Sequence, residues 1–200
     1  MTVLIDEALV AAAADGDRDT VRDLLQRGSP PDARNDKGQS ALSMAASRNH
    51  AEVVQVLLDH GADPDGAGAD PSPARAACIM MAADALRTLL AAGADPESRH
   101  TDGQSLLNGV FLAEGTVRDR GFLELAKMLI DAGASIDSAD GDGATPLTRA
   151  VVLGRPESVR WLLDRGADPD KGGSQGLSLL EIAKSRKQTE IVRLLTAASR

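Results

Sequence analysis

One stretch of the chain reads Asp140-Gly-Asp-Gly-Ala-Thr-Pro-Leu-Thr-Arg-Ala150 and continues through Glu157-Ser-Val-Arg-Trp-Leu-Leu163 to Gly166-Ala-Asp-Pro169. Thr145 can cap a helix N-terminus, because its hydroxyl accepts from a free backbone N–H, and Pro146 suits the first helical position. The second apolar run ends at Gly166, which can adopt the left-handed conformation that closes a helix. The stretch therefore predicts two short helices joined by a turn.

The same unit recurs along the chain at a nearly fixed period. The closing glycines are Gly28, Gly61, Gly93, Gly133 and Gly166, which lie 33, 32, 40 and 33 residues apart. Such a period indicates a repeat architecture, whatever the local secondary-structure assignments. We therefore divide the chain into units of about residues 2–34, 35–67, 68–99, 100–139, 140–172 and 173–200.

The unit resembles the ankyrin repeat. The resemblance lies in Thr145-Pro146-Leu147 and Ala150, then Leu162-Leu163 and Gly166-Ala167-Asp168, at a period of about 33 residues. It implies an all-α ankyrin-repeat solenoid of stacked helix-turn-helix units with short β-hairpin or loop connections. Residues 1–200 then form a single ankyrin-repeat domain, in which each unit buries its apolar side mainly against its neighbours. The terminal units keep less of the pattern, which is typical of capping repeats.

The fourth unit contains the step of 40 residues, and aligning both of its ends leaves the seven residues 114–120 over. This insertion lies between the two helices of one unit, at the edge opposite the hairpins. Insertions at such an edge often contact a partner, and Val117 and Arg118 are then the candidate contacts. The alternative is a tolerated extension, since each doubling of loop length costs only about 0.6 kcal/mol.

Charge and composition exclude several classes of function. The net charge of −8 and the pI near 4.9 argue against nucleic acid, whose phosphates need a basic face. No apolar run approaches the roughly 18 residues of a membrane span. With Cys78 as its one cysteine, the chain forms no internal disulfide, which fits a reducing compartment. We expect a cytoplasmic protein, monomeric by itself, that uses no cofactor.

No catalytic pattern is found. The histidines are not placed at ligand spacing with carboxylates, and Gly-x-Ser-x-Gly, His-Glu-x-x-His and phosphate-loop motifs do not occur. Asp140, Asp142 and Gly143 faintly resemble a calcium loop, but no Glu stands at the twelfth position, and hairpin geometry explains them better. Cys78 falls at a small-residue position, which favours a buried thiol over a nucleophile. We therefore expect no enzyme activity and no metal.

Helical geometry indicates where a partner protein would bind. Counted from the capping residue of the first helix, positions 2, 5, 6 and 9 share one face, position 7 points away from it and position 8 lies at its margin. The resemblance implies that positions 7 and 8 and the hairpin tips line a concave face that holds partners. The candidate contacts on this face are Arg48, Ile79, Met80, Leu112, Val152, Leu153 and Arg186.

These positions are apolar in the three middle units and not in their neighbours. An exposed apolar patch on a soluble monomer usually marks an interaction site. The alternative is that Ile79, Leu112 and Val152 pack between adjacent first helices. Position 8 discriminates between the two, because Met80 and Leu153 should be the more exposed if the groove is real.

The segments between each closing glycine and the next cap are acidic, with 13 Asp or Glu against 4 Arg or Lys. Some of these acids, such as Asp63, are turn formers by type. We expect the excess to be larger than the turns require and to form a row of negative tips. Such a row favours a partner with a basic rim and an apolar anchor, and its attraction weakens with salt. The candidate tip contacts are Asp36, Asp70, Asp102 and Asp142.

These observations favour a non-enzymatic protein-protein interaction module, acting as an adaptor or scaffold. The alternative is a dedicated inhibitor, of the immunity type or a regulatory subunit, of a basic enzyme or toxin. An inhibitor is expected to bind one protein tightly and abolish its activity in a titration.

Overall fold

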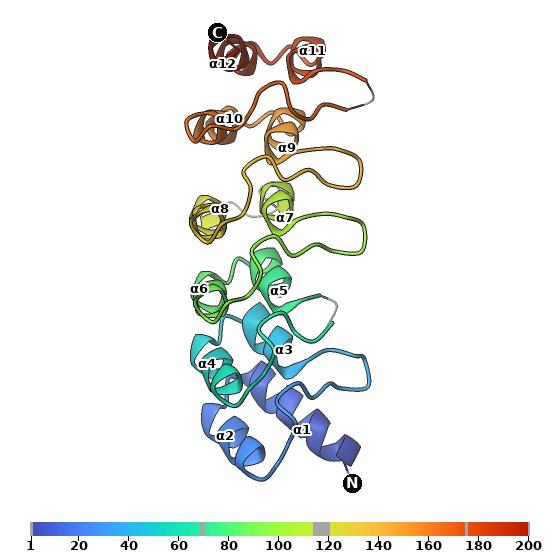
Figure 1. Ribbon diagram of the computed structural model, residues 1–200, viewed down its shortest axis with the longest axis vertical. Helices are drawn as coiled ribbons and strands as arrows, with labels where there is room; N and C mark the ends of the chain where they lie inside the picture. The colour runs from blue at the N-terminus through green and yellow to red at the C-terminus, as the bar shows by residue number, and fades with distance from the viewer. Residues whose placement is uncertain (1, 69–70, 114–120, 175, 200) are drawn as a thin grey trace.

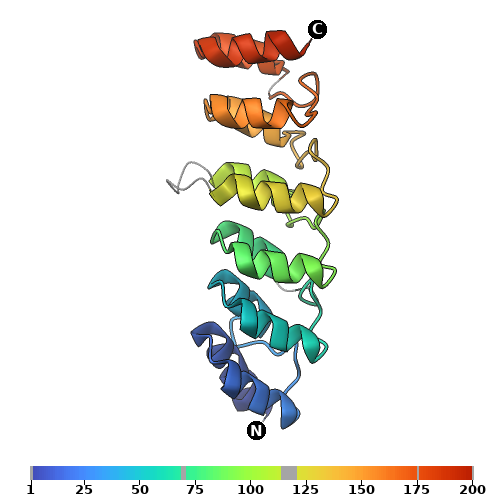
Figure 2. The same ribbon diagram turned by 90° about the vertical axis from the view of Figure 1, so that its left-hand side faces the viewer.

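The computed structural model describes residues 2–68, 71–113, 121–174 and 176–199, and shows helix pairs stacked into an elongated array (Figures 1 and 2). The inner helices, which lie beside the loops that project from one edge, are α1 (Thr2–Asp15), α3 (Ala41–Ser47), α5 (Pro73–Ile79), α7 (Leu106–Ala113), α9 (Pro146–Val152) and α11 (Leu179–Ser185). The outer helices are α2 (Arg18–Gln26), α4 (Ala51–Asp59), α6 (Ala83–Ala91), α8 (Gly121–Asp131), α10 (Pro156–Leu163) and α12 (Thr189–Ala198). The predicted all-α repeat solenoid is confirmed, while the unit boundaries stay an interpretation of the sequence period.

The helices begin and end where local chemistry predicts. The hydroxyls of Ser40, Ser72, Thr145 and Ser178 each accept from the backbone N–H three residues on, and Ser105 does the same for Asn108 at 3.2 Å. These bonds satisfy N–H groups that have no partner inside the first helical turn. The five closing glycines have φ between 87° and 110°, a conformation that costs little only without a Cβ.

The core lies between neighbouring units. Inner helices pack on inner helices, and buried Leu42, Leu107 and Leu147 lie in this layer. Outer helices form the second layer on the other side of the stack (Figure 1). At the junction of the fourth and fifth units, the buried Phe111 ring meets Phe122 edge-on at 5.9 Å between centroids and Trp161 at 6.2 Å. These rings fill the space between α7, α8 and α10.

A row of carboxylates joins each unit to the next through the backbone. We call it the carboxylate ladder: the side chain four residues after one closing glycine accepts from the N–H two residues after the following closing glycine. Asp32 bonds Asp63 N at 3.0 Å, Asp65 bonds Asp95 N at 2.8 Å, Glu97 bonds Ser135 N, and Asp137 bonds Asp168 N at 3.0 Å.

The ladder shows that one expectation is wrong, namely that the acidic excess exceeds what the turns require. Besides the four ladder residues, Asp63, Asp95 and Asp168 each accept from the N–H two residues on within their own turn. Most acids in these segments are therefore structural, because their carboxylates satisfy backbone donors that bond no other group among the described residues.

We expect Asp137→Ala to lower the free energy of unfolding by about 1–3 kcal/mol, the range for losing a hydrogen bond to a charged group. Asp137 is mostly buried, at 14% side-chain exposure, and it also pairs with Lys171 at 3.1 Å. Asp137→Asn should lose less, because an amide oxygen still accepts from Asp168 N–H. Urea unfolding followed by circular dichroism measures the difference.

The matched control is Asp142→Ala, which removes the same charge from an exposed carboxylate that accepts no hydrogen bond among the described residues. It should change the unfolding free energy by less than about 0.5 kcal/mol. Equal losses in Asp137→Ala and Asp142→Ala would show that charge, and not the ladder bond, determines the effect.

Candidate binding face

Four large apolar side chains are exposed on the middle inner helices and the residues that end them. Ile79 is 49% exposed, Met80 60%, Leu112 45% and Leu153 38%. We call these residues the central patch. Val152 is different, since it is half-buried and packs against the core, as the packing alternative predicts for it. Ile79 and Leu112 are exposed, so packing between adjacent first helices does not account for them.

A pocket of about 250 Å³ lies beside the central patch, between α5 and α7. Sequence reasoning missed it, although a glycine inside a predicted helix is a signal for close approach or open space. Here Gly109 leaves room on α7, and Arg75 spans the pocket edge by donating from Nη2 to Gln104 Oε1 at 3.1 Å. The lining residues are Arg75, Cys78, Ile79, Gln104, Leu106, Gly109 and Leu112.

Cys78 forms part of the pocket floor and is 2% exposed. Burial raises the pKa of its thiol from 9.0 to about 12, because the thiolate would lose its hydration, and nearby Arg75 offsets this only in part. The prediction of a buried thiol is therefore confirmed. At neutral pH the group is a protonated, apolar contact for its neighbours.

The predicted contacts Arg48 and Arg186 lie at the two ends of the face and are both exposed. Each also makes a hydrogen bond to the preceding unit. Arg48 Nη1 donates to Ala14 O at 3.2 Å and lies 3.8 Å from Asp15 Oδ1, while Arg186 Nη1 donates to Val152 O at 2.8 Å. These arginines therefore join inner helices as well as bounding the central patch.

The predicted tip residues Asp36, Asp102 and Asp142 are exposed. The backbone N–H of Gln104 holds the pKa of Asp102 below its usual value, and His100 lowers it further. Asp70, Val117 and Arg118 lie outside the described residues, as does the whole 114–120 insertion. The tips and the central patch lie at opposite ends of the inner helices, because the loops precede these helices and the patch residues end them.

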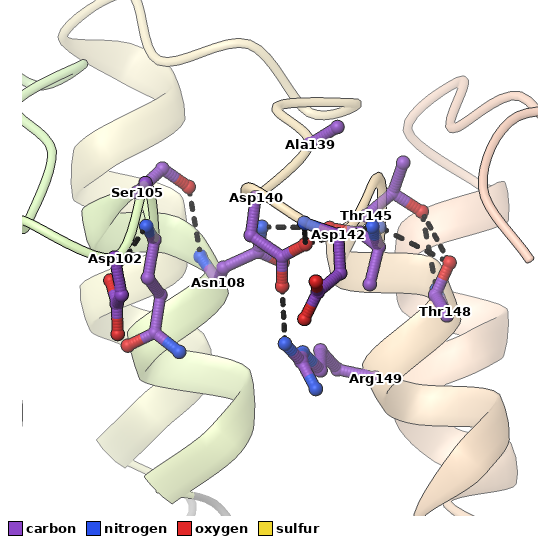
Figure 3. A network of polar contacts seen from close by, with 12 residues as sticks. Asp102, Ser105, Asn108, Ala139, Asp140, Asp142, Thr145, Thr148 and Arg149 are labelled. Carbon is purple, nitrogen blue, oxygen red and sulfur yellow. Dashed lines mark hydrogen bonds and ion pairs between the residues drawn. The ribbon is translucent and has the colours of Figure 1, made fainter. Parts of the chain in front are cut away.

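The Asp140-Gly-Asp-Gly segment forms a turn braced by polar contacts (Figure 3). Asp140 is 5% exposed at its side chain; it accepts from the N–H groups of Asp142 at 3.0 Å and Ala144 at 2.9 Å and pairs with Arg149. Asn108 reaches this turn from α7 by donating from Nδ2 to Ala144 O at 3.0 Å. The motif that faintly resembles a calcium loop therefore uses its first carboxylate inside the fold.

Stacked helix pairs with an exposed inner face define a tandem-repeat binding domain. The family model described as ankyrin repeats (3 copies) matches residues 9–100 and 114–199. This chain belongs to the ankyrin repeat family, and the resemblance seen in the sequence is confirmed. Within the part of the chain that the structure describes, no helix combines the length and apolarity needed to cross a bilayer.

Relatives with this fold differ widely in size. The chain is 29% identical over 194 residues to the ankyrin repeat protein YahD of Escherichia coli K12, which covers 94% of this chain and 93% of YahD. It is 31% identical over 196 residues to human mitochondrial disaggregase, but spans only 26% of that protein. The matched region therefore makes up most of YahD but only about a quarter of the disaggregase.

Solved structures agree on the fold. An ankyrin repeat domain from Acinetobacter baumannii AYE superposes with a TM-score of 0.83 at 29% identity, covering 96% of this chain and 97% of the other. The ankyrin repeat domain of Bcl-3, a member of the IkappaB family, gives 0.85 at 29% identity, covering 96% and 85%.

We expect Cys78 to resist thiol reagents while the chain is folded. The shift of its pKa to about 12 cuts the thiolate fraction by about a thousandfold at pH 8, since each pKa unit is a factor of ten. Labelling by dithiobis-nitrobenzoate should therefore be slow in buffer and complete within minutes in urea. Fast labelling of the folded chain would mean that the pocket floor opens to solvent.

Proposed function

We propose that this chain is a non-enzymatic module that binds another protein through the central patch and the exposed tips, as an adaptor or scaffold. Ankyrin repeats generally mediate protein-protein interaction. The observation that supports this function for the present chain is the exposure of four large apolar side chains on consecutive inner helices α5, α7 and α9 and the residues that end them. Side chains of this kind are rarely left together in water unless a partner covers them.

The central patch alone would support only weak binding. Four aliphatic side chains at about 1.5–3 kcal/mol each stabilise a complex by roughly 6–12 kcal/mol, while association costs about 4–15 kcal/mol. Contacts beyond the patch are therefore needed. The tips Asp36, Asp102 and Asp142 can supply them to a partner with a basic rim, and the net charge of −8 would speed its approach.

The second candidate is a dedicated inhibitor, of the immunity type or a regulatory subunit, of a basic enzyme or toxin. The acidic surface favours it, because a strong field of one sign suits a single target of the opposite sign. An adaptor leaves its partner active, whereas an inhibitor abolishes one activity at a one-to-one ratio. Both candidates exclude nucleic acid and membrane as partners, and both keep the expected cytoplasmic location and monomeric state as predictions.

We expect Met80→Asp combined with Leu153→Asp to release the partner while leaving helix content and melting temperature nearly unchanged. Both side chains are already in contact with water, so their charge costs the free chain little, whereas a partner would have to desolvate it. Affinity capture from native cell extract, at low and high salt, measures retention. The comparison is made for the proteins that the unmodified chain retains at low salt.

The control is Ala91→Asp, because Ala91 is exposed but ends the outer helix α6, away from both the central patch and the tips. It should keep the partner. Unfolding of the double variant would show that Met80 and Leu153 belong to the core, and equal retention by all three chains would overturn the proposed binding face.

A further inference from the structure

Each inner helix ends in backbone carbonyls that have no partner within the helix. Such carbonyls hold the negative end of the helix dipole. At the end of α1 the carbonyl is Ala14 O, and at the end of α9 it is Val152 O. Val152 lies seven residues after Thr145, the residue that caps α9, and Ala14 stands at the equivalent position of the first unit.

In the outermost junctions the chain satisfies these carbonyls with an arginine from the following unit. Arg48 Nη1 donates to Ala14 O at 3.2 Å, and the His50 ring Nε2 lies 3.1 Å from the same oxygen. Arg186 Nη1 donates to Val152 O at 2.8 Å. Both arginines stand at position 8 of their units. The same arginine-to-carbonyl hydrogen bond therefore occurs at both ends of the array.

Two of the three middle junctions, those of the second unit with the third and of the third unit with the fourth, have the carbonyl but not the arginine. The equivalent acceptors are Ser47 O and Ile79 O, and position 8 of the next unit is occupied by Met80 and Ala113 respectively. The thioether of Met80 cannot donate. No donor in the described part of the chain bonds either oxygen. The backbone N–H groups of Ala51 and Ala83, which would bond these oxygens if the helices continued, donate instead to Asn49 O and Met81 O.

We propose that the partner supplies the missing cation: an arginine side chain that donates to Ser47 O while its stem packs on Met80 and Ile79. This inference rests on the proposed function and specifies what the central patch recognises. Arg48 and Arg186 show the binding mode within this chain, and the acidic net charge favours it. Arginine suits the site better than lysine because its planar fork of donors reaches an acceptor while the stem stays on apolar surface.

Arg75, the cationic residue that lines the pocket, does not bond these two carbonyl oxygens. Arg75 stands four residues before Ile79 on α5, and its guanidinium donates to Gln104 on the loop side. A partner arginine at the far end of α5 would be separated from it by about one turn of helix, roughly 5 Å along the axis. The central patch therefore combines apolar side chains with a backbone carbonyl acceptor at its border.

The first test places the arginine in the chain itself. Met80→Arg should bond Ser47 O as Arg48 bonds Ala14 O, which raises the melting temperature by about 2–4 °C, the shift expected in a chain of this size for a bond of this strength. The same variant should lose the partner, because the acceptor is occupied. Met80→Leu, which adds no donor, should leave both the melting temperature and binding as they are. A Met80→Arg chain with an unchanged or lower melting temperature would overturn the inference.

The second test needs no natural partner. The peptide acetyl-Leu-Arg-Leu-amide should shift the backbone amide signals of residues 47–49 and 79–82 in nitrogen-15 correlation spectra of the full chain. The same peptide with citrulline, which keeps the shape but not the charge, should shift them at least fivefold less at equal concentration. Met80→Arg should abolish the shifts. Equal shifts with arginine and citrulline, or shifts spread evenly over the acidic tips, would contradict the proposed site.

The two proposals can fail separately. If Met80→Asp with Leu153→Asp releases a protein but the arginine peptide leaves residues 47–49 and 79–82 unchanged, the binding face stands and the arginine contact is wrong. If the double variant retains every protein, the binding face itself is wrong, whatever the peptide does.

Discussion

No unit of this chain can bury its apolar side by itself, so every unit depends on contact with the next. The inner helices provide this contact through small and aliphatic side chains, and the carboxylate ladder joins the same neighbours through backbone N–H groups. Apolar burial is not directional, whereas each ladder bond requires one distance and one angle. Together they set how one unit lies on the next and hence align the inner helices into a continuous face.

The acidic character of the chain follows largely from this construction. Carboxylates of Asp32, Asp65, Asp137 and Glu97 accept from the neighbouring unit, so replacing them to reduce the net charge of −8 would remove structural bonds. Their charge still contributes to the field around the protein, because hydrogen bonding does not neutralise it. The same side chains thus hold neighbouring units together and contribute to this negative field, and the exposed tips Asp36 and Asp142 add to it.

The candidate binding face differs in its side chains between its middle and its ends. At the ends, Arg48 and Arg186 bond the last carbonyl of the preceding inner helix and add charge to the surface. In the middle, no described residue donates to that carbonyl, and the exposed Met80 side chain carries no charge. Next to the patch, the rings of Phe111, Phe122 and Trp161 fill the core between α7, α8 and α10.

The sequence by itself determined the repeat period, the caps at Ser40 and Thr145, the closing glycines and the exposed apolar positions Ile79, Met80, Leu112 and Leu153, because these depend on neighbours within one or two helical turns. It did not reveal the ladder, the Arg75–Gln104 contact or the bonds of Arg48 and Arg186. Those join residues 29 to 38 positions apart in the chain. Only the stacking of one unit on the next brings such groups within hydrogen-bond distance, and a carboxylate read in sequence looks the same whether it faces water or a neighbouring backbone.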